Sequence, residues 1–189
     1  MSKDTDQQLV DRVLEGDKQA FNLLVVRYQQ RVIALIARFV NDPQEVEDVS
    51  QEAFIKAYRA LSLFRGESTF YTWLYRIAVN TAKNHLVAKS RRPPAVDMDV
   101  DESQNNDLAM SLRELESPEE SLVTEDLKQA IEKAIDELPE ELKTAFTLRE
   151  FSGLSYEDIT EIMDCPVGTV RSRIFRAREA IDKRIRELM

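Results

Sequence analysis

The sequence predicts an all-α protein in which two small helical domains are joined by a flexible acidic linker. Helix-forming Leu, Ala, Glu, Arg and Lys are abundant among the 189 residues, whereas Gly (4) and Pro (6) are scarce. Hydrophobic residues recur at helical spacing, and no segment has strand character of useful length. An acidic stretch in the middle of the chain divides these segments into two groups.

The first predicted domain, residues 1–92, contains four helices. Gly16 ends a short first helix, and Asp17 can cap the second with its side-chain oxygen. Pro43 opens the third helix, because proline fits the first helical position. A turn-like loop, FRGEST, precedes the fourth helix. After the first helix, we expect helical segments over residues 18–41, 43–61 and 70–89.

The second predicted domain, residues 122–189, ends in two closely joined helices. In SYED, Ser155 and Asp158 have the pattern of a capping box at the start of a short helix. The tight connection MDCPVG follows, and Pro166 suits the first position of the last helix. Two short helices joined in this way resemble a helix-turn-helix unit. Before them we expect helical segments over residues 122–138 and 140–151.

The segment between the domains, residues 93–121, is predicted to be a linker. It begins with two prolines and continues with acidic residues, Asn, Ser and Gln, with few large apolar side chains. Such a segment cannot bury enough apolar surface to offset the entropy lost on ordering. We therefore expect a flexible tether with at most short helical pieces.

The charge of the chain is unevenly distributed. The formal net charge is -9, to which residues 1–95 contribute +3, residues 96–121 contribute -8 and residues 122–189 contribute -4. Two stretches are nevertheless strongly basic, Phe54–Arg92 and Cys165–Arg186. Overall acidity argues against indiscriminate binding of nucleic acid, whereas two separate basic patches favour a specific contact with a polyanion at two points.

Several classes of protein are excluded by what the sequence lacks. The N-terminus is acidic where a signal peptide is basic and then apolar, and no apolar run approaches the roughly 20 residues needed to span a bilayer. We expect a cytoplasmic protein without membrane insertion. The single cysteine, Cys165, suits a reducing compartment and a structural role. No phosphate loop or Cys/His metal set is present, and we expect His85 to be packed in the structure, so we predict no enzyme, no metal and no cofactor.

The last helix has two distinct faces. At about 100° per residue, its core stripe is Val170, Ile174, Ala177 and Ile181. Phe175 points away from this stripe, and a large exposed aromatic is unusual on a solvated face. In a DNA major groove, Arg can read guanine, Phe can contact a thymine methyl group, and Ser and flanking Arg can hold phosphates. The candidate DNA-binding residues of this domain are Arg149, Thr169, Arg171, Ser172, Arg173, Phe175 and Arg176.

Two alternatives remain open for this domain. The arginines could form a solvated or salt-bridged helix face without a ligand. Arg149, in the preceding helix, could be either a phosphate contact or an exposed surface residue.

A second candidate surface lies on the fourth helix of the first domain. Basic and amide side chains interleaved with aromatics suit a nucleic acid with exposed bases, because aromatics stack on bases while Lys and Arg follow the backbone. Phe64 and Phe70 bracket the FRGEST loop and could wall a pocket for one extruded base, although core packing would also explain these aromatics. The candidate residues are Phe64, Phe70, Thr72, Trp73, Arg76, Asn80, Lys83 and Asn84.

The segments that carry these features resemble a known family. The stretches GDKQAFNLLVVRYQ, DVSQEAFIKAYRALSLFRGESTFYTWLYRIAVNTAKN, RRPP and LPEELKTAFTLREFSGLSYEDITEIMDCPVGTVRSRIFRAREAID are similar to bacterial extracytoplasmic-function sigma factors, in particular the sigma-E envelope-stress group. The resemblance covers nearly the whole chain apart from the acidic linker. It implies sigma region 2 in the first domain and sigma region 4, with the helix-turn-helix, in the second.

The resemblance also implies partners for each part of the chain. The helix carrying Asp48, Gln51, Glu52 and Phe54 would bind core RNA polymerase, with Ser50 altering that face where the family has a small apolar residue. The candidate surface of the first domain would capture the non-template strand of the -10 promoter element, and that of the second domain would read the -35 element. The linker would enter the basic channel of the polymerase. A membrane-anchored anti-sigma factor would mask both domains.

Two surfaces on one tether also suggest a mechanism. Surfaces that bind weakly alone gain effective concentration when both dock on a common scaffold. A stand-alone DNA-binding regulator that uses only the helix-turn-helix is the main rival, but it has no need of the second basic and aromatic surface. An enzyme acting on nucleic acid would need a catalytic constellation, which the sequence lacks.

Overall fold

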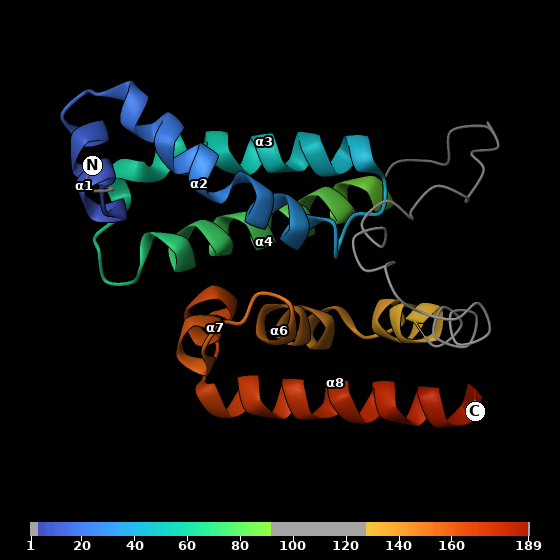
Figure 1. Ribbon diagram of the computed structural model, residues 1–189. Helices are drawn as coiled ribbons and strands as arrows, with labels where there is room; N and C mark the ends of the chain where they lie inside the picture. Colours follow the sequence, from blue (N-terminus) through green and yellow to red (C-terminus); the bar gives the residue numbers. More distant parts are fainter. Residues whose placement is uncertain (1–3, 92–127, 189) are drawn as a thin grey trace, which may run out of the picture. The chain divides into compact units, whose positions relative to one another are not determined.

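A computed structural model describes residues 4–91 and 128–188, which form two compact units of helices (Figure 1). In these described ranges all regular structure is helical, which confirms the all-α prediction. The first unit contains the N-terminal helices together with residues 147–167, and the second contains residues 128–146 and 168–188. The predicted linker, residues 93–121, lies outside the described residues.

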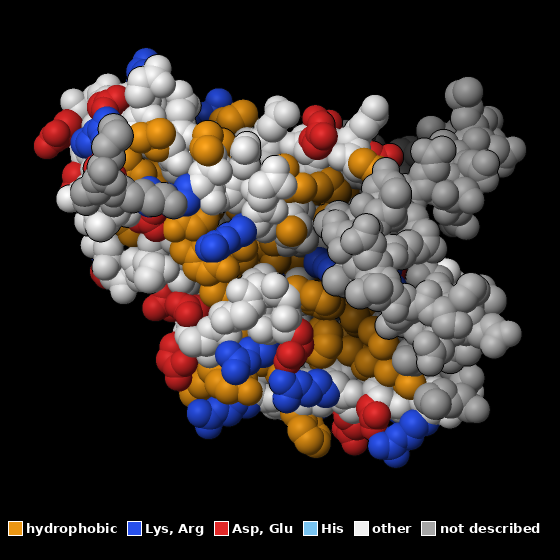
Figure 2. Space-filling model, in the orientation of Figure 1, with side chains coloured by type: hydrophobic (Ala, Val, Ile, Leu, Met, Phe, Trp, Pro, Cys, Tyr) orange, Lys and Arg blue, Asp and Glu red, His pale blue; other side chains and the backbone are white. Residues whose placement is uncertain are grey.

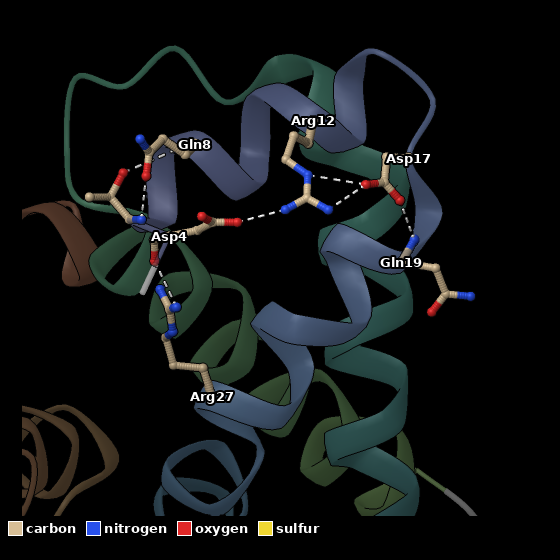
Figure 3. A network of polar contacts seen from close by, with 7 residues as sticks. Asp4, Gln8, Arg12, Asp17, Gln19 and Arg27 are labelled. Carbon is tan, nitrogen blue, oxygen red and sulfur yellow. Dashed lines mark hydrogen bonds and ion pairs between the residues drawn. The ribbon is translucent and has the colours of Figure 1, made fainter. Parts of the chain in front are cut away.

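Helix α1 (Asp6–Leu14) is fastened to helix α2 (Lys18–Ile36) by charged side chains. Arg12 donates from Nη1 to Asp4 Oδ2 at 2.6 Å and from Nη2 to Asp17 Oδ2 at 2.7 Å (Figure 3). Asp17 also caps α2, as predicted, by accepting from the Gln19 amide at 3.0 Å. Because Arg12 reaches the start of both helices, it fixes the turn between them.

Helix α2 is shorter than the sequence predicted. It ends at Ile36 and not at Asn41, because the amide of Phe39 donates to the carbonyl of Ile36 at 2.9 Å and tightens the chain into a turn. Phe39 and Val40 are nevertheless 7% and 2% exposed. The turn after α2 also contributes apolar side chains to the core, so the hydrophobic spacing continues past the end of the helix. For this reason the sequence predicted the end of the helix too late.

Helix α3 (Pro43–Ala60), the short 3-10 helix η1 (Leu61–Leu63) and helix α4 (Phe70–Ser90) complete the N-terminal part of the first unit. Helix α4 packs against both α2 and α3. Its start is capped by Thr69, whose hydroxyl accepts from the Thr72 amide at 3.1 Å. This packing buries one side of α4 and leaves the other side exposed.

A polar cluster joins the start of α3 to the end of α4. His85 Nε2 lies 3.1 Å from Glu45 Oε2, and Lys89 Nζ lies 2.9 Å from Glu45 Oε1. The hydrogen bond from Lys89 lowers the pKa of Glu45 despite partial burial, and His85 adds to the effect. His85 is therefore a partly buried residue in a structural contact.

The C-terminal part of the chain contains a helix over residues 128–136, then α6 (Glu140–Glu150), α7 (Tyr156–Met163) and α8 (Val167–Leu188). In the second unit, Ala134, Ile135 and Leu138 form an apolar cluster with Ala177 and Ile181 of α8. The sequence predicted each of these helices. The predicted start of the first of them, at residue 122, lies outside the described residues.

The turn between α7 and α8 has an unusual backbone conformation. Ser155 and Asp158 form the predicted capping box at the start of α7. At the other end of α7, Asp164 adopts the left-handed conformation with φ of 49°, which residues with a Cβ rarely adopt. Among the described non-glycine residues Asp164 is the one with positive φ. The Cys165 amide donates back to the Thr160 carbonyl at 3.3 Å and closes the turn.

We expect Asp164→Gly to raise the free energy of unfolding by about 0.5–1 kcal/mol, because glycine adopts a left-handed conformation without a Cβ clash. Urea denaturation of the full chain measures this change. Ala180→Gly, at an exposed position within α8, is the control and should destabilise by about 0.5–1 kcal/mol. If both variants destabilise the protein, the Asp164 side chain makes a contact that stabilises the fold by more than the left-handed backbone conformation destabilises it.

Candidate nucleic-acid interface

Helix α8 has the two faces that the sequence predicted. Val170, Ile174, Ala177 and Ile181 are at most 8% exposed, so the predicted core stripe is confirmed. On the opposite side Phe175 is 67% exposed. Arg171, Ser172 and Arg176 are also exposed, and Thr169 is half-buried. Figure 2 shows basic side chains gathered along α8, with acidic ones between them.

Arg173 differs from the other arginines at the start of α8. Its Nη2 lies 2.7 Å from Glu141 Oε2 of α6, and its side chain is only 23% exposed. The ion pair fastens α8 to the start of α6 within the second unit. Arg173 therefore has a protein partner where the sequence analysis placed a DNA contact, which remains a prediction.

Arg149 lies in the last turn of α6, just before the loop that leads to α7. Its Nη1 donates to the Leu154 carbonyl at 2.7 Å, and its guanidinium carbon lies 4.8 Å from the centre of the Tyr156 ring. These contacts close the loop around Gly153, whose φ of 66° suits a residue without a Cβ. Arg149 thus holds the turn that leads into the helix-turn-helix, whether or not it also contacts a phosphate.

The outer face of α4 carries the polar stripe that the sequence predicted for this helix. Arg76, Asn80 and Asn84 are exposed, and Trp73 and Lys83 are half-buried. Thr72 differs, because it is 1% exposed. The exposed residues of the stripe are therefore accessible to a ligand. Thr72 is buried and is not accessible.

The aromatic residues beside this stripe form one cluster. The ring centres of Phe64 and Trp73 are 5.3 Å apart, and those of Phe64 and Phe70 are 6.0 Å apart in an edge-to-face arrangement. Phe70 is only 3% exposed. A base inserted between Phe64 and Phe70, as the sequence analysis suggested, would have to separate rings that are in contact. The accessible space lies instead in a hollow of about 740 Å³, whose lining includes Phe64, Arg65, Trp73 and Arg76.

The candidate polymerase-binding helix, α3, exposes only part of the predicted set. Asp48, Gln51 and Glu52 are exposed, whereas the Phe54 ring is 9% exposed and belongs to the core. Ser50 is also buried, and its hydroxyl donates to the Val46 carbonyl at 2.6 Å, so its side chain lies inside the unit.

Two apolar residues on the exposed face of α3 were missed. Ile55 and Tyr58 are 50% and 41% exposed. The helical spacing from Asp48 through Glu52 to Ile55 was the signal that could have identified them, because these residues share one face.

The described residues were also compared with the patterns of membrane-spanning helices and of metal sites. None of their helices is long and apolar enough to cross a membrane. They also contain no group of three or more His, Cys, Asp or Glu side chains that could hold a metal ion.

Two family models match the chain: Sigma-70 region 2 over residues 24–92, and Sigma-70, region 4 over residues 128–181. The RNA polymerase sigma-H factor of Pseudomonas aeruginosa is 58% identical over 189 residues, which cover 100% of this chain and 98% of that protein. The ECF RNA polymerase sigma-E factor of Escherichia coli K12 is 60% identical over 185 residues, or 98% and 96% of the two chains.

A solved structure has the same fold. It is that of the sigma factor RpoE in complex with the anti-sigma factor NepR from Bartonella quintana, with a TM-score of 0.63 and 22% identity over 88% of this chain and 96% of that chain. The fold, the two family matches and the identities along nearly the whole length establish that this chain belongs to the extracytoplasmic-function sigma factors.

Proposed function

We propose that the chain binds core RNA polymerase and directs promoter-specific initiation, with α4 recognising the -10 element and α8 the -35 element. The observation that carries this proposal is the exposed Phe175 among basic side chains, on the side of α8 away from its buried stripe. A helix fixed on one side and carrying Arg, Ser and an aromatic on the other suits insertion into a major groove. The second surface, on α4, distinguishes a sigma factor from a simple repressor.

On α8, the exposed residues fall into two roles. Arg176 and Phe175 are exposed on the side of α8 away from the core stripe and are proposed to read base edges, because Arg donates to guanine O6 and N7 and Phe contacts a thymine methyl group. Ser172 and Arg171 are proposed to hold phosphates and set the register. Arg173 and Arg149 are proposed to act by orienting the helices, since both have protein partners.

On α4, the proposed ligand is an unpaired strand. Trp73 offers a partly exposed ring for stacking, Asn80 offers an amide that can hydrogen-bond a base edge, and Arg76 can follow the backbone. The protein is acidic overall, so this surface is proposed to bind DNA well only after polymerase has positioned it.

The exposed face of α3 is proposed to dock on core polymerase. Its carboxylates at Asp48 and Glu52 share the exposed face with the apolar Ile55 and Tyr58, and protein interfaces typically combine apolar and polar residues. Phe54 would support this face from the core and not touch the partner.

We further propose an envelope-stress role with control by a membrane-anchored anti-sigma factor that masks residues of both domains, 1–92 and 122–189. The E. coli relative carries the sigma-E name, and the Bartonella sigma factor of the same fold was solved with an anti-sigma factor. The acidic segment 93–121 would serve the basic channel of the polymerase.

Run-off transcription tests the proposed function directly. Purified full-length chain and core polymerase are mixed with a template library in which the -10 and -35 elements are randomised. We expect transcripts that start at a fixed distance from one selected pair of elements. Core polymerase alone is the control, and the same transcript yield with and without the chain would contradict the proposal.

Arg176→Ala should reduce discrimination at a single -35 base pair by about 1–3 kcal/mol, because a bidentate contact to one base is lost. Binding of the polymerase complex to templates with each substitution in the -35 element measures this. Lys183→Ala, on the same helix and 79% exposed, is the matched control and should leave base preference unchanged. Equal weakening by Arg176→Ala on all templates would instead identify a phosphate contact.

Asn80→Ala should impair strand opening while leaving binding to core polymerase unchanged, because the amide contacts a base and not the enzyme. Permanganate reactivity of unpaired thymines reports opening, and a core-binding titration reports assembly. Asn22→Ala, an exposed asparagine of α2, serves as the control for loss of an amide. If Asn80→Ala weakens core binding, Asn80 has a structural role.

A further inference from the structure

Helix α1 lies beside the segment that joins α3 to α4 (Figure 1). It packs against α2 and against η1. From η1 the chain continues into the loop of residues 64–69, which contributes Phe64 and Arg65 to the same hollow that Trp73 lines. No part of α1 falls within the region 2 match, which begins at residue 24, and yet α1 reaches the proposed -10 surface by two routes.

The first route leads from Gln7 to the loop at Gly66. Gly66 has a φ of 70°, a left-handed conformation that suits a residue without a Cβ. Gln7 Oε1 lies 3.7 Å from the position that a Cβ on this glycine would occupy, so the amide of Gln7 lies over Gly66. Gln7 Nε2 donates to Asp11 Oδ1 at 2.8 Å, which holds the amide on its own helix. Gln7 therefore limits how far the loop can move toward α1.

The second route leads from Asp6 to the aromatic cluster through Tyr28 of α2. The Asp6 carboxylate accepts hydrogen bonds from the Tyr28 hydroxyl and from Arg27 Nη1. Burial raises the pKa of Tyr28, and the hydrogen bond to Asp6 raises it further, so the hydroxyl keeps the proton that it donates. The Tyr28 ring is 6% exposed, and its centre lies 5.7 Å from that of Phe70. Asp6 thus fixes the Tyr28 ring against Phe70.

Phe70 in turn contacts Trp73, the residue proposed to stack on a base. The ring centres of Phe70 and Trp73 are 5.8 Å apart, and Phe64 contacts both rings. Protein interiors are close-packed, so rings in contact cannot move independently. Displacement of the Tyr28 ring would therefore displace Phe70 and with it Trp73. The two routes from α1 end at the loop and at the ring that line one hollow.

We propose that α1 positions the -10 surface for base recognition, through Asp6 and Gln7. Asp6 acts on the Trp73 ring by way of Tyr28. Gln7 acts on the loop at Gly66. Both are positioning residues, because they act through neighbours and not on the DNA, and the inference rests on the proposed role of α4 in binding the -10 strand. A site discriminates between ligands only when supporting side chains hold its walls in place, so weakening either support should reduce base preference.

Two variants each remove one of the two routes without changing any residue assigned to DNA. Tyr28→Phe keeps the ring and deletes only the hydroxyl that donates to Asp6. Gln7→Ala deletes the amide that lies over Gly66. Because Gln7 is exposed, this second variant tests the proposal even if Tyr28→Phe does not fold.

Matched controls remove the same groups elsewhere in the first unit. Tyr75→Phe deletes another buried hydroxyl, which donates to the Arg31 carbonyl at 3.4 Å, and Gln30→Ala deletes an exposed amide of α2. A rescue variant combines Gln7→Glu with Asp11→Asn, so that the hydrogen bond between the two side chains forms in the opposite direction. Gln7→Glu alone places two carboxylates four residues apart on one helix, where they repel each other.

The first measurement needs neither polymerase nor DNA. Trp73 is the only tryptophan of the chain, so the fluorescence of the full-length protein reports on this surface. We expect acrylamide to quench Trp73 more strongly in Tyr28→Phe and in Gln7→Ala than in the parent, because the ring and the loop become more mobile. Tyr75→Phe and Gln30→Ala should be quenched like the parent.

The second measurement is base preference in run-off transcription with core polymerase. Two templates compete in each reaction, one with the selected -10 element and one with a single-base substitution. We expect Tyr28→Phe, Gln7→Ala and Gln7→Glu each to lower the ratio of the two transcripts about three- to tenfold at one or more -10 positions. The rescue variant and both controls should keep the ratio of the parent. A core-binding titration should give the same affinity for all proteins.

The outcomes separate this inference from the function on which it rests. If the parent prefers one -10 sequence and the variants show the same ratios, or the same quenching of Trp73, the positioning role is wrong and the -10 assignment stands. Equal loss of transcripts from every template, or weaker binding to core polymerase, would also overturn the positioning role, because α1 would then only maintain the fold. If the parent itself shows no base preference at the -10 element, the -10 assignment fails and the inference fails with it.

Discussion

The burial of one apolar stripe on each of two helices is the constraint on which the rest of the structure depends. In α4 the stripe includes Leu74 and Ala78, and in α8 it includes Val170 and Ile174, all 0–1% exposed. Each large apolar side chain contributes about 1.5–3 kcal/mol when fully buried, so rotating either helix would be very costly. The residues opposite each stripe are therefore presented to a ligand in a fixed direction before any ligand arrives.

Several polar side chains around the two candidate surfaces hold the scaffold. Arg149 closes the turn before α7, Arg173 pairs with Glu141, and the Thr72 hydroxyl is shared between Thr69 and Asp158. A basic or hydroxyl side chain near a binding surface is thus weak evidence for a direct contact. The residues with exposed functional groups, such as Arg176 and Asn80, form a smaller and more specific set.

Helix α7 connects the two surfaces in a way that neither surface shows alone. A short turn with Asp164 in the left-handed conformation joins it to α8, and its Asp158 accepts a hydrogen bond from Thr72 of α4.

The sequence by itself determined the helices, their caps and the rotation of α8. Helical periodicity is a local property, so Val170 and Ile174 identified the buried side and Phe175 the exposed side without any knowledge of the fold. Similarly, Ser155 and Asp158 revealed the start of α7, because a cap involves only neighbouring residues. The family resemblance added the expected partners of each helix.

Only the tertiary structure decided which side chains are free to act. The burial of Phe54 beside exposed Ile55, and of Phe39 and Val40 beyond the end of α2, depends on neighbours distant in the sequence. The contact of α7 with α4 joins residues more than 80 positions apart. Such contacts arise from the shapes and charges of surfaces that meet after the helices have formed, and a pattern within one helix carries no record of them.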